Sequence, residues 1–413
     1  MGESIFTRHI EKRSKIVKNK DMLLTSYLPG ELPHRSSEID SVATIIASAF
    51  KGNKPSNIMI FGTTGTGKTA VMNFIGNELK KEDPSGTTCS YIYLNCQIID
   101  TPYGILYEIG RQTKTVDDSA RMPFTGWSIE KIYSEIKKHL DEQNKVFIVV
   151  LDEIDRLAKK SGSGDDVLYH LSKINEDFKK SKLSLVGISN DLKFMDFLDS
   201  RIKSRLGEEK IIFHHYNAPQ LEDILRSRAK LAFEEGVLEE DVIPFCAALS
   251  AQEMGDARRA LALLRISAEA AERNGDLVVT EAHVRYAKNK IESDVVTEVV
   301  KTLTLQSQTV LMSIIYNTKD DDRVMTTGEV YSTYKELCKI LQISVLTQRR
   351  ITDLISELDM LGIIHAPVKS FGRAGRTKEI ELSITKEVCK VLENSEGMKP
   401  LKTYKPPKQT TLV

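Results

Sequence analysis

The chain has 413 residues, and at roughly 150 residues per domain this length predicts two or three domains and excludes a single small module. Hydrophobic residues make up 41% and charged residues 28%, as in globular proteins, and apolar runs such as residues 146–151 are far shorter than the ~20 residues that cross a bilayer, so we expect no membrane partner. The formal net charge is zero, which excludes a nucleic-acid partner only if the charge is evenly spread.

The charge is unevenly spread. Residues 301–413 carry 17 Lys+Arg against 13 Asp+Glu, a net charge of +4 that leaves −4 for residues 1–300. Residues 1–20 are themselves basic, so an acidic middle lies between two basic ends. The five cysteines form no CxxC pair, so we expect buried thiols, no zinc site and a reducing, cytoplasmic location.

The first part of the chain shows a strand and helix alternation. Residues 1–25 contain few apolar positions and are predicted to form a flexible basic arm. The run NIMIF at 57–61 predicts a buried strand that leads through a glycine-rich turn into a helix. Further strands are predicted at 90–96, 146–152, 183–189 and 210–216. This alternation predicts an α/β core over residues 26–217, with a parallel sheet covered by helices on both faces.

The glycine-rich turn reads GTTGTGKT at 62–69 and fits the P-loop pattern G-x-x-x-x-G-K-[ST] between a strand and a helix. Glycines let backbone N–H groups approach phosphates, and the helix N-terminus adds positive potential. We expect Lys68 to contact the β- and γ-phosphates of ATP or ADP, and Thr69 to bind Mg²⁺. The predicted phosphate-binding residues are Gly62, Gly65, Thr66, Gly67, Lys68, Thr69 and Ala70.

A pair of carboxylates follows the third predicted strand. The apolar run 146–151 ends in Asp152 and Glu153. Asp152 is predicted to hold Mg²⁺ through water and Glu153 to act as the general base for the attacking water. Asp-Glu after a strand is equally typical of an exposed turn, and the P-loop upstream favours the catalytic interpretation.

The second half of the chain predicts two further domains and a tail. Residues 218–295 show amphipathic helices closed by glycine and predict an all-α domain. Residues 296–395 show three helices followed by two strand-like runs, the order of a winged helix. Residues 396–413 are rich in Pro and Lys and are predicted to be disordered.

The predicted winged helix carries candidate contacts to double-stranded DNA. Its third helix opens with polar residues ahead of an apolar stripe at 351–361, and a basic segment at 369–378 occupies the wing. A winged helix places its third helix in the major groove and its wing on the backbone or minor groove. A protein-binding winged helix is the alternative. The candidate DNA-binding residues are Thr347, Gln348, Arg350, Lys369, Arg373 and Arg376.

The Asp-Glu pair and the helical domain behind the sheet resemble the AAA+ ATPases, in which that helical domain is a lid. The resemblance implies that Asn190 orients the lytic water and that Arg258, rather than Arg259, reaches the phosphates from the lid. It implies an arginine finger given to a neighbouring subunit, with Arg205 preferred to Arg201. At the hinge, Tyr216 would stack on adenine or, equally, pack within the hinge. Arg228 would approach ribose or phosphate, and His34 and Arg35 would lie on the other side of the base.

Five segments resemble the archaeal relatives of the origin recognition complex and cell-division-control initiators over residues 20–390. They are LPHRSSEI (32–39), LNCQIIDTPYGILYEIGRQ (94–112), LDEIDRL (151–157), SRLGEEKIIFHHY (204–216) and GDARRAL (255–261). The resemblance implies a slow, ATP-switched protein that acts at the nucleoid, binds origin DNA, helps recruit the replicative helicase and works with other initiator paralogues. It also implies a second DNA contact from residues 100–127 of the ATPase core.

Two other functions are compatible with the same motifs. A regulatory paralogue would occupy origins and repress initiation. A P-loop signalling ATPase would use its winged helix only to bind protein.

Overall fold

The computed structural model describes residues 16–113, 126–159, 164–318, 325–370 and 376–404. The chain forms two compact units, Met1–Val284 and Arg285–Val413. This division and the boundary predicted at residue 295 both fall within one helix, α12 (Glu281–Thr302). Within the described ranges, no helix combines the length and the apolar character that a bilayer span requires.

A five-stranded sheet in the order β2-β3-β4-β1-β5 forms the centre of the first unit. Every pairing is parallel, which confirms the predicted sheet. The strands are β1 (Ile58–Phe61), β2 (Cys89–Asn95), β3 (Val146–Asp152), β4 (Lys182–Ser189) and β5 (Glu209–Ile212). All seven residues of β3 are buried, as expected for an apolar central strand covered on both faces.

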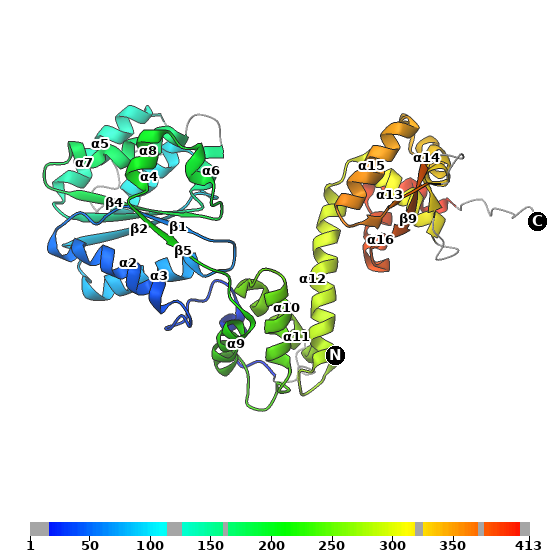
Figure 1. The fold of residues 1–413 in the computed structure, drawn as a ribbon, viewed down its shortest axis with the longest axis horizontal. Helices are drawn as coiled ribbons and strands as arrows, with labels where there is room; N and C mark the ends of the chain where they lie inside the picture. Colours follow the sequence, from blue (N-terminus) through cyan, green and yellow to red (C-terminus); the bar gives the residue numbers. More distant parts are fainter. Residues whose placement is uncertain (1–15, 114–125, 160–163, 319–324, 371–375, 405–413) are drawn as a thin grey trace, which may run out of the picture. The chain divides into compact units, whose positions relative to one another are not determined.

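Helices cover both faces of this sheet (Figure 1). On one face, α2 (Ser36–Ile46) and α3 (Lys68–Glu82) pack against the sheet through a cluster of buried aliphatic side chains. On the other face, a second buried cluster joins the sheet to the remaining helices. These are α4 (Pro102–Thr113), α5 (Ile129–Glu142), α7 (Gly164–Asp177) and α8 (Ser200–Leu206), with the short α6 (Asp155–Lys159) after β3.

Parallel strands bring the residues that follow β1, β3 and β4 to one edge of the sheet. The pairing sets Phe61 beside Ser189, and Asp152 beside Ile188. Because the carboxyl ends of parallel strands share an edge, the P-loop after β1, the carboxylates that begin at Asp152 and the polar Asn190 after β4 converge there.

The helical domain packs beside this edge. It consists of α9 (Ala218–Ala232), α10 (Val242–Gln252), α11 (Ala257–Asn274) and the beginning of α12. Asn217 starts α9 through a capping box with Gln220, and the Asp256 carboxylate caps the first turn of α11. These caps place the first turn of each helix, and therefore Arg258 in α11.

Part of the predicted flexible arm is ordered against the helical domain. Ile16 is buried, Val17 pairs with Phe233, and the short helix η1 (Lys20–Leu23) buries Leu23. The prediction of a flexible arm is wrong for residues 16–24, because Ile16 and Leu23 are buried and the backbone of residues 17–19 pairs with residues 232 and 233. Residues 1–15 lie outside the described part of the chain.

The second unit is a winged helix, as predicted. Three helices, α13 (Leu305–Thr318), α14 (Thr327–Leu341) and α15 (Gln348–Met360), share one buried core. Three short strands pair antiparallel with β9 (Arg376–Leu382): β6 (Met325–Thr326), β7 (Ile364–His365) and β8 (Val368–Ser370). The helix α16 (Lys386–Glu393) follows the sheet.

Two predictions about this unit are corrected. The tail predicted to be disordered from residue 396 forms the short helix η6 (Glu396–Thr403), because Met398 and Leu401 are buried in the core of the unit. The Tyr404 hydroxyl then donates to Glu336 on α14. Leu361, predicted as core, is 48% exposed because α15 ends one residue earlier. Residues 405–413 lie outside the described part of the chain.

Candidate functional site

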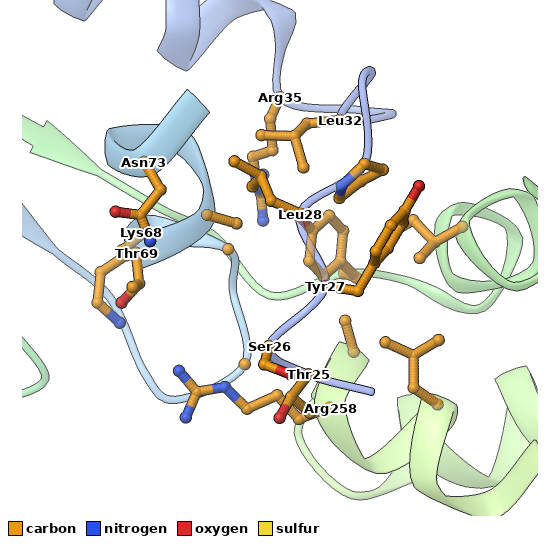
Figure 2. A pocket seen from close by; sticks show the side chains of 18 of the residues that line it. Thr25, Ser26, Tyr27, Leu28, Leu32, Arg35, Lys68, Thr69, Asn73 and Arg258 are labelled. Atoms are coloured by element: carbon orange, nitrogen blue, oxygen red, sulfur yellow. The ribbon is translucent and has the colours of Figure 1, made fainter. Parts of the chain in front are cut away.

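A pocket lies where the sheet edge meets the helical domain (Figure 2). Residues 25–35, which we call the strap, cross from η1 to α2 and form one wall. Figure 2 shows Lys68 and Thr69 at the start of α3 on one side, Tyr27 and Leu28 of the strap on the other, and Arg258 entering from a helix of the lid.

The P-loop has the backbone that its glycines permit. Gly65 and Gly67 have φ values of 72° and 89°, in the left-handed region that favours glycine. A Cβ on Gly62 would lie 2.6 Å from the carbonyl oxygen of Phe213. Gly67 through Ala70 line the pocket at the N-terminus of α3, which suits an anion. The Thr66 side chain is buried and donates to Thr63 O, so it stabilises the loop instead of lining the pocket.

Hydrogen bonds hold the Lys68 side chain beside the N-terminus of α3. Its buried ammonium donates to Gly62 O at 2.8 Å, to Thr63 O at 2.6 Å and to Asn190 Oδ1 at 2.8 Å. Burial lowers the pKa of Lys68 to about 8, although the nearby Asp152 opposes the shift. A buried cation whose three hydrogen-bond acceptors are all neutral is strongly stabilised by an anionic partner such as a phosphate.

Asp152 and Thr69 form a pair of hard oxygen donors. The Asp152 carboxylate is buried, and its Oδ2 accepts the Thr69 hydroxyl at 2.7 Å and the Tyr93 hydroxyl at 2.6 Å. The Glu153 N–H donates to Asp152 Oδ1 at 2.9 Å. A carboxylate and a hydroxyl beside a phosphate-binding loop fit Mg²⁺, which prefers oxygen ligands.

Glu153 lines the pocket directly after Asp152. Its φ of 55° lies in the left-handed region, which is unusual for a residue with a side chain. Such strain is concentrated at functional positions, where the surroundings hold it in place. The geometry therefore favours Glu153 as a residue placed for chemistry.

The helical domain touches the P-loop through the start of α11. Ala257 N donates to Gly65 O at 3.2 Å, and a Cβ built on Gly65 would overlap the Asp256 carboxylate. Arg258 lines the pocket, whereas Arg259 pairs with Glu253 at 2.6 Å. This arrangement favours Arg258 over Arg259 as the phosphate-directed arginine of the lid.

The predicted finger arginines are not part of this pocket. On α8, Arg205 pairs with Glu176 at 2.6 Å. Arg201 pairs with Asp199 and lies over the ring of Tyr169. A finger acts on a neighbouring chain, so its assignment to Arg205 stays a prediction.

The hinge residues Tyr216 and Arg35 both line the pocket, and their contacts with a base stay predictions. Tyr216 is only 6% exposed, and the Arg35 guanidinium lies 4.0 Å from its ring centroid, so Arg35 covers one ring face. Arg35 also donates to Thr66 O and to His214 O, which ties the hinge to the P-loop. His34 is paired with Asp223 at 2.9 Å, and its side chain lies outside the pocket lining.

Arg228 holds the strap. Its guanidinium donates to Met22 O at 3.2 Å and to Tyr27 O at 2.9 Å, and it lies 4.7 Å from the Tyr27 ring centroid. Arg228 also lines the pocket, so its approach to ribose or phosphate stays a prediction, while these contacts give it a role in holding the strap. Sequence reasoning missed the strap itself, which lines the pocket with apolar side chains suited to a base. They are Tyr27, Leu28, Pro29, Leu32 and Pro33, and the Leu-Pro repetition was the available signal.

Arg228→Ala is expected to speed nucleotide release roughly tenfold, because two hydrogen bonds and one cation–π contact that hold the strap are lost. Chasing a bound fluorescent ADP with excess ADP measures the rate. Arg226→Ala is the matched control, since Arg226 lies on the same helix and pairs with Glu222. An unchanged release rate in Arg228→Ala, with a normal thermal melt, contradicts the role given to the strap.

The winged helix exposes the beginning of α15. Thr347 caps the helix by accepting the Arg350 N–H, and Gln348, Arg349 and Arg350 are exposed on its first turn. Arg349 was not singled out from the sequence. Lys369 on β8 pairs with Glu379 at 2.6 Å. Arg373 lies outside the described residues, as does the side chain of Arg376.

The fold and the pocket define an AAA+ ATPase joined to a winged helix. The chain matches the family models for the AAA domain over residues 52–194, the Cdc6 AAA+ ATPase-type lid domain over 222–289, and the CDC6 C-terminal winged helix domain over 298–390. These matches confirm the core, lid and winged-helix fold class.

Curated relatives and a solved structure then identify the family. The chain is 51% identical over 408 residues to ORC1-type DNA replication protein 1 of Methanosarcina mazei, covering 98% of this chain and 96% of that one. It is 48% identical over 411 residues to the ORC1-type DNA replication protein of Thermococcus kodakarensis, covering 99% and 98%. The Aeropyrum pernix ORC1 protein, solved in complex with DNA, is 43% identical, with a TM-score of 0.73 over 94% of this chain and 99% of that one. The chain belongs to the ORC1/Cdc6 family of archaeal AAA+ replication initiators.

Proposed function

We propose that the chain binds Mg²⁺-ATP in the pocket between core and lid, and binds double-stranded origin DNA in a nucleotide-controlled manner. The observation that carries this proposal is the convergence of Lys68, Asp152 and Asn190 of the core with Arg258 of the lid on one pocket. In the same chain, a winged helix exposes a polar, arginine-containing helix start. Family membership supports the same proposal.

The pocket residues have separate roles in ATP binding and hydrolysis. Lys68 exchanges its carbonyl and Asn190 partners for the phosphates, and the strap covers the base. Thr69 and Asp152 hold Mg²⁺, which neutralises phosphate charge when bound. Glu153 accepts a proton from the attacking water, and Asn190, released by Lys68, orients that water.

Hydrolysis by a single chain is slow in this proposal. Neither Arg205 nor Arg201 lines the pocket, so neither candidate finger is placed to act on the γ-phosphate of its own chain. An arginine finger contributes about 10³–10⁵ to the rate in the phosphoryl-transfer enzymes where it has been measured. A single chain therefore retains ATP as a switch, and another copy or a paralogue accelerates turnover by supplying Arg205.

DNA binding is assigned to two surfaces. Thr347, Gln348 and Arg350 at the start of α15 read the major groove, while Lys369, Arg373 and Arg376 of the wing contact phosphates. The related Aeropyrum pernix ORC1 protein was solved with DNA, which supports DNA binding by this chain. Residues 100–127, of which 114–125 lie outside the described part of the chain, supply a second contact from the ATPase core.

Arg373→Ala combined with Arg376→Ala is expected to weaken DNA binding and to reduce the slope of log K against log[salt] by about two units. Each arginine that neutralises a phosphate contributes about one unit to this slope. Fluorescence anisotropy with an origin fragment at several salt concentrations measures this slope. Lys339→Ala on α14 is the control, since this exposed lysine lies outside the wing and α15. An unchanged slope in the double variant would show that these two arginines of the wing do not contact DNA phosphates.

Helicase recruitment is the final element of the proposal. Footprinting on genomic origin fragments with ATP and with ADP tests origin binding and its nucleotide control. Helicase recovery on the same DNA then tests recruitment: an initiator increases it, whereas a repressing paralogue decreases it. Absence of DNA binding at physiological salt contradicts both forms and favours a protein-binding winged helix.

A further inference from the structure

A tyrosine on the neighbouring strand contacts the predicted metal carboxylate. Tyr93 lies on β2, which runs parallel to β3, and the register sets Asn95 beside Asp152. The side chain of Tyr93, two residues earlier on β2, reaches Asp152 Oδ2 with its hydroxyl at 2.6 Å. The two residues are 59 positions apart, and no motif in the sequence connects them.

Tyr93 differs from the other two donors to this carboxylate. The Glu153 N–H follows Asp152 directly in the chain, and the Thr69 hydroxyl belongs to the predicted metal site. Only the third donor, Tyr93, comes from another strand and takes no part in the predicted metal coordination. A tyrosine hydroxyl carries a proton that it can donate in a hydrogen bond, and here the carboxylate of Asp152 accepts that bond.

Both the side chain and the backbone of Tyr93 are held by contacts. Its ring packs against the buried cluster under α3, and its backbone carbonyl oxygen accepts Gln112 Nε2 of α4 at 3.2 Å. A donor held in this way fixes the rotation of a carboxylate that would otherwise turn about its own bonds.

We propose that Tyr93 is a positioning residue for the magnesium site. Its hydroxyl holds Asp152 in the orientation that binds Mg²⁺ together with Thr69, without touching the nucleotide. This inference rests on the proposed binding of Mg²⁺-ATP. Removal of partners that orient metal ligands typically costs about 10–100-fold in metal affinity or activity.

The test is Tyr93→Phe, which keeps the ring and removes the hydroxyl. Isothermal titration with a non-hydrolysable ATP analogue gives the affinity in EDTA and at a series of free Mg²⁺ concentrations. We expect Tyr93→Phe to need about tenfold more Mg²⁺ for the half-maximal gain in affinity, with unchanged affinity in EDTA.

Tyr91→Phe is the matched control. Tyr91 lies two residues earlier on the same strand, and its hydroxyl donates to Met72 O at 2.7 Å, away from Asp152. Tyr91→Phe therefore also removes a tyrosine hydroxyl bond, and we expect it to keep the wild-type Mg²⁺ midpoint.

The outcomes separate the inference from the proposed function. A wild-type Mg²⁺ midpoint in Tyr93→Phe overturns the role of Tyr93 and leaves Mg²⁺-ATP binding intact. An equal loss of affinity with and without Mg²⁺ also overturns it, because the hydroxyl then acts on packing and not on the metal. A wild-type protein whose affinity ignores Mg²⁺ contradicts the proposed function, and the inference with it.

Discussion

Lys68→Ala is expected to lower ATP affinity by roughly 100-fold or more. Each hydrogen bond to a charged group contributes about 1.5–3 kcal/mol, and Lys68 is placed to make such bonds to two phosphates. Burial lowers the pKa of Lys68 to about 8, so its desolvated charge gains from a phosphate partner. The variant also loses the hydrogen bonds that Lys68 donates to Gly62 O, Thr63 O and Asn190 Oδ1, so its stability is compared with that of the wild type. Isothermal titration gives the affinity, and a thermal melt gives the stability.

Lys81→Ala controls for the loss of one lysine from α3. Lys81 is 71% exposed and pairs with Glu78, away from the pocket. We expect wild-type affinity in this variant. If Lys68→Ala also bound ATP with wild-type affinity, the phosphate site would lie elsewhere.

Glu153→Gln is expected to retain ATP binding and to reduce the hydrolysis rate by about 100-fold or more, the range that a general base contributes. Glutamine keeps the length of the side chain and faces the same backbone φ of 55°, so the change removes the proton acceptor with little other disturbance. Single-turnover hydrolysis of radiolabelled ATP measures the rate, and titration measures binding.

Glu135→Gln provides the comparison for this variant. Glu135 is exposed on α5 and outside the pocket, so its replacement should leave the rate unchanged. Normal turnover in Glu153→Gln would contradict the assignment of Glu153 as the general base. Another residue at the sheet edge would then accept the proton.

The P-loop and Asp152 at the edge of the sheet could be predicted from local sequence patterns, because such patterns define both the residue types and their positions. The P-loop is defined by eight consecutive residues, and its strand and helix are encoded immediately beside it. Asp152 could be placed because β3 is a wholly apolar strand that ends at a charge. The parallel topology then brings these segments together without further information.

Contacts between distant residues could not be predicted in this way. Arg228 contacts the carbonyl of Tyr27 across 201 positions, and an exposed arginine on α9 would have shown the same helical pattern. Tyr93 looks like any aromatic residue in a strand until β2 and β3 are paired. The ordering of residues 16–24 and of η6 likewise depends on partners far along the chain. The composition of a segment contains no information about the distant residues against which it packs.

The strap gives the lid a second, non-covalent attachment to the core. Residues 16–23 are hydrogen-bonded to α9 of the lid and continue as residues 25–35 to α2, and the chain itself enters the lid at Asn217. A body attached by one linker has every direction of movement open to it, whereas a body attached at two points rotates about the axis that joins them. One of the two attachments is also a wall of the proposed nucleotide pocket, so this rotation of the lid would move that wall.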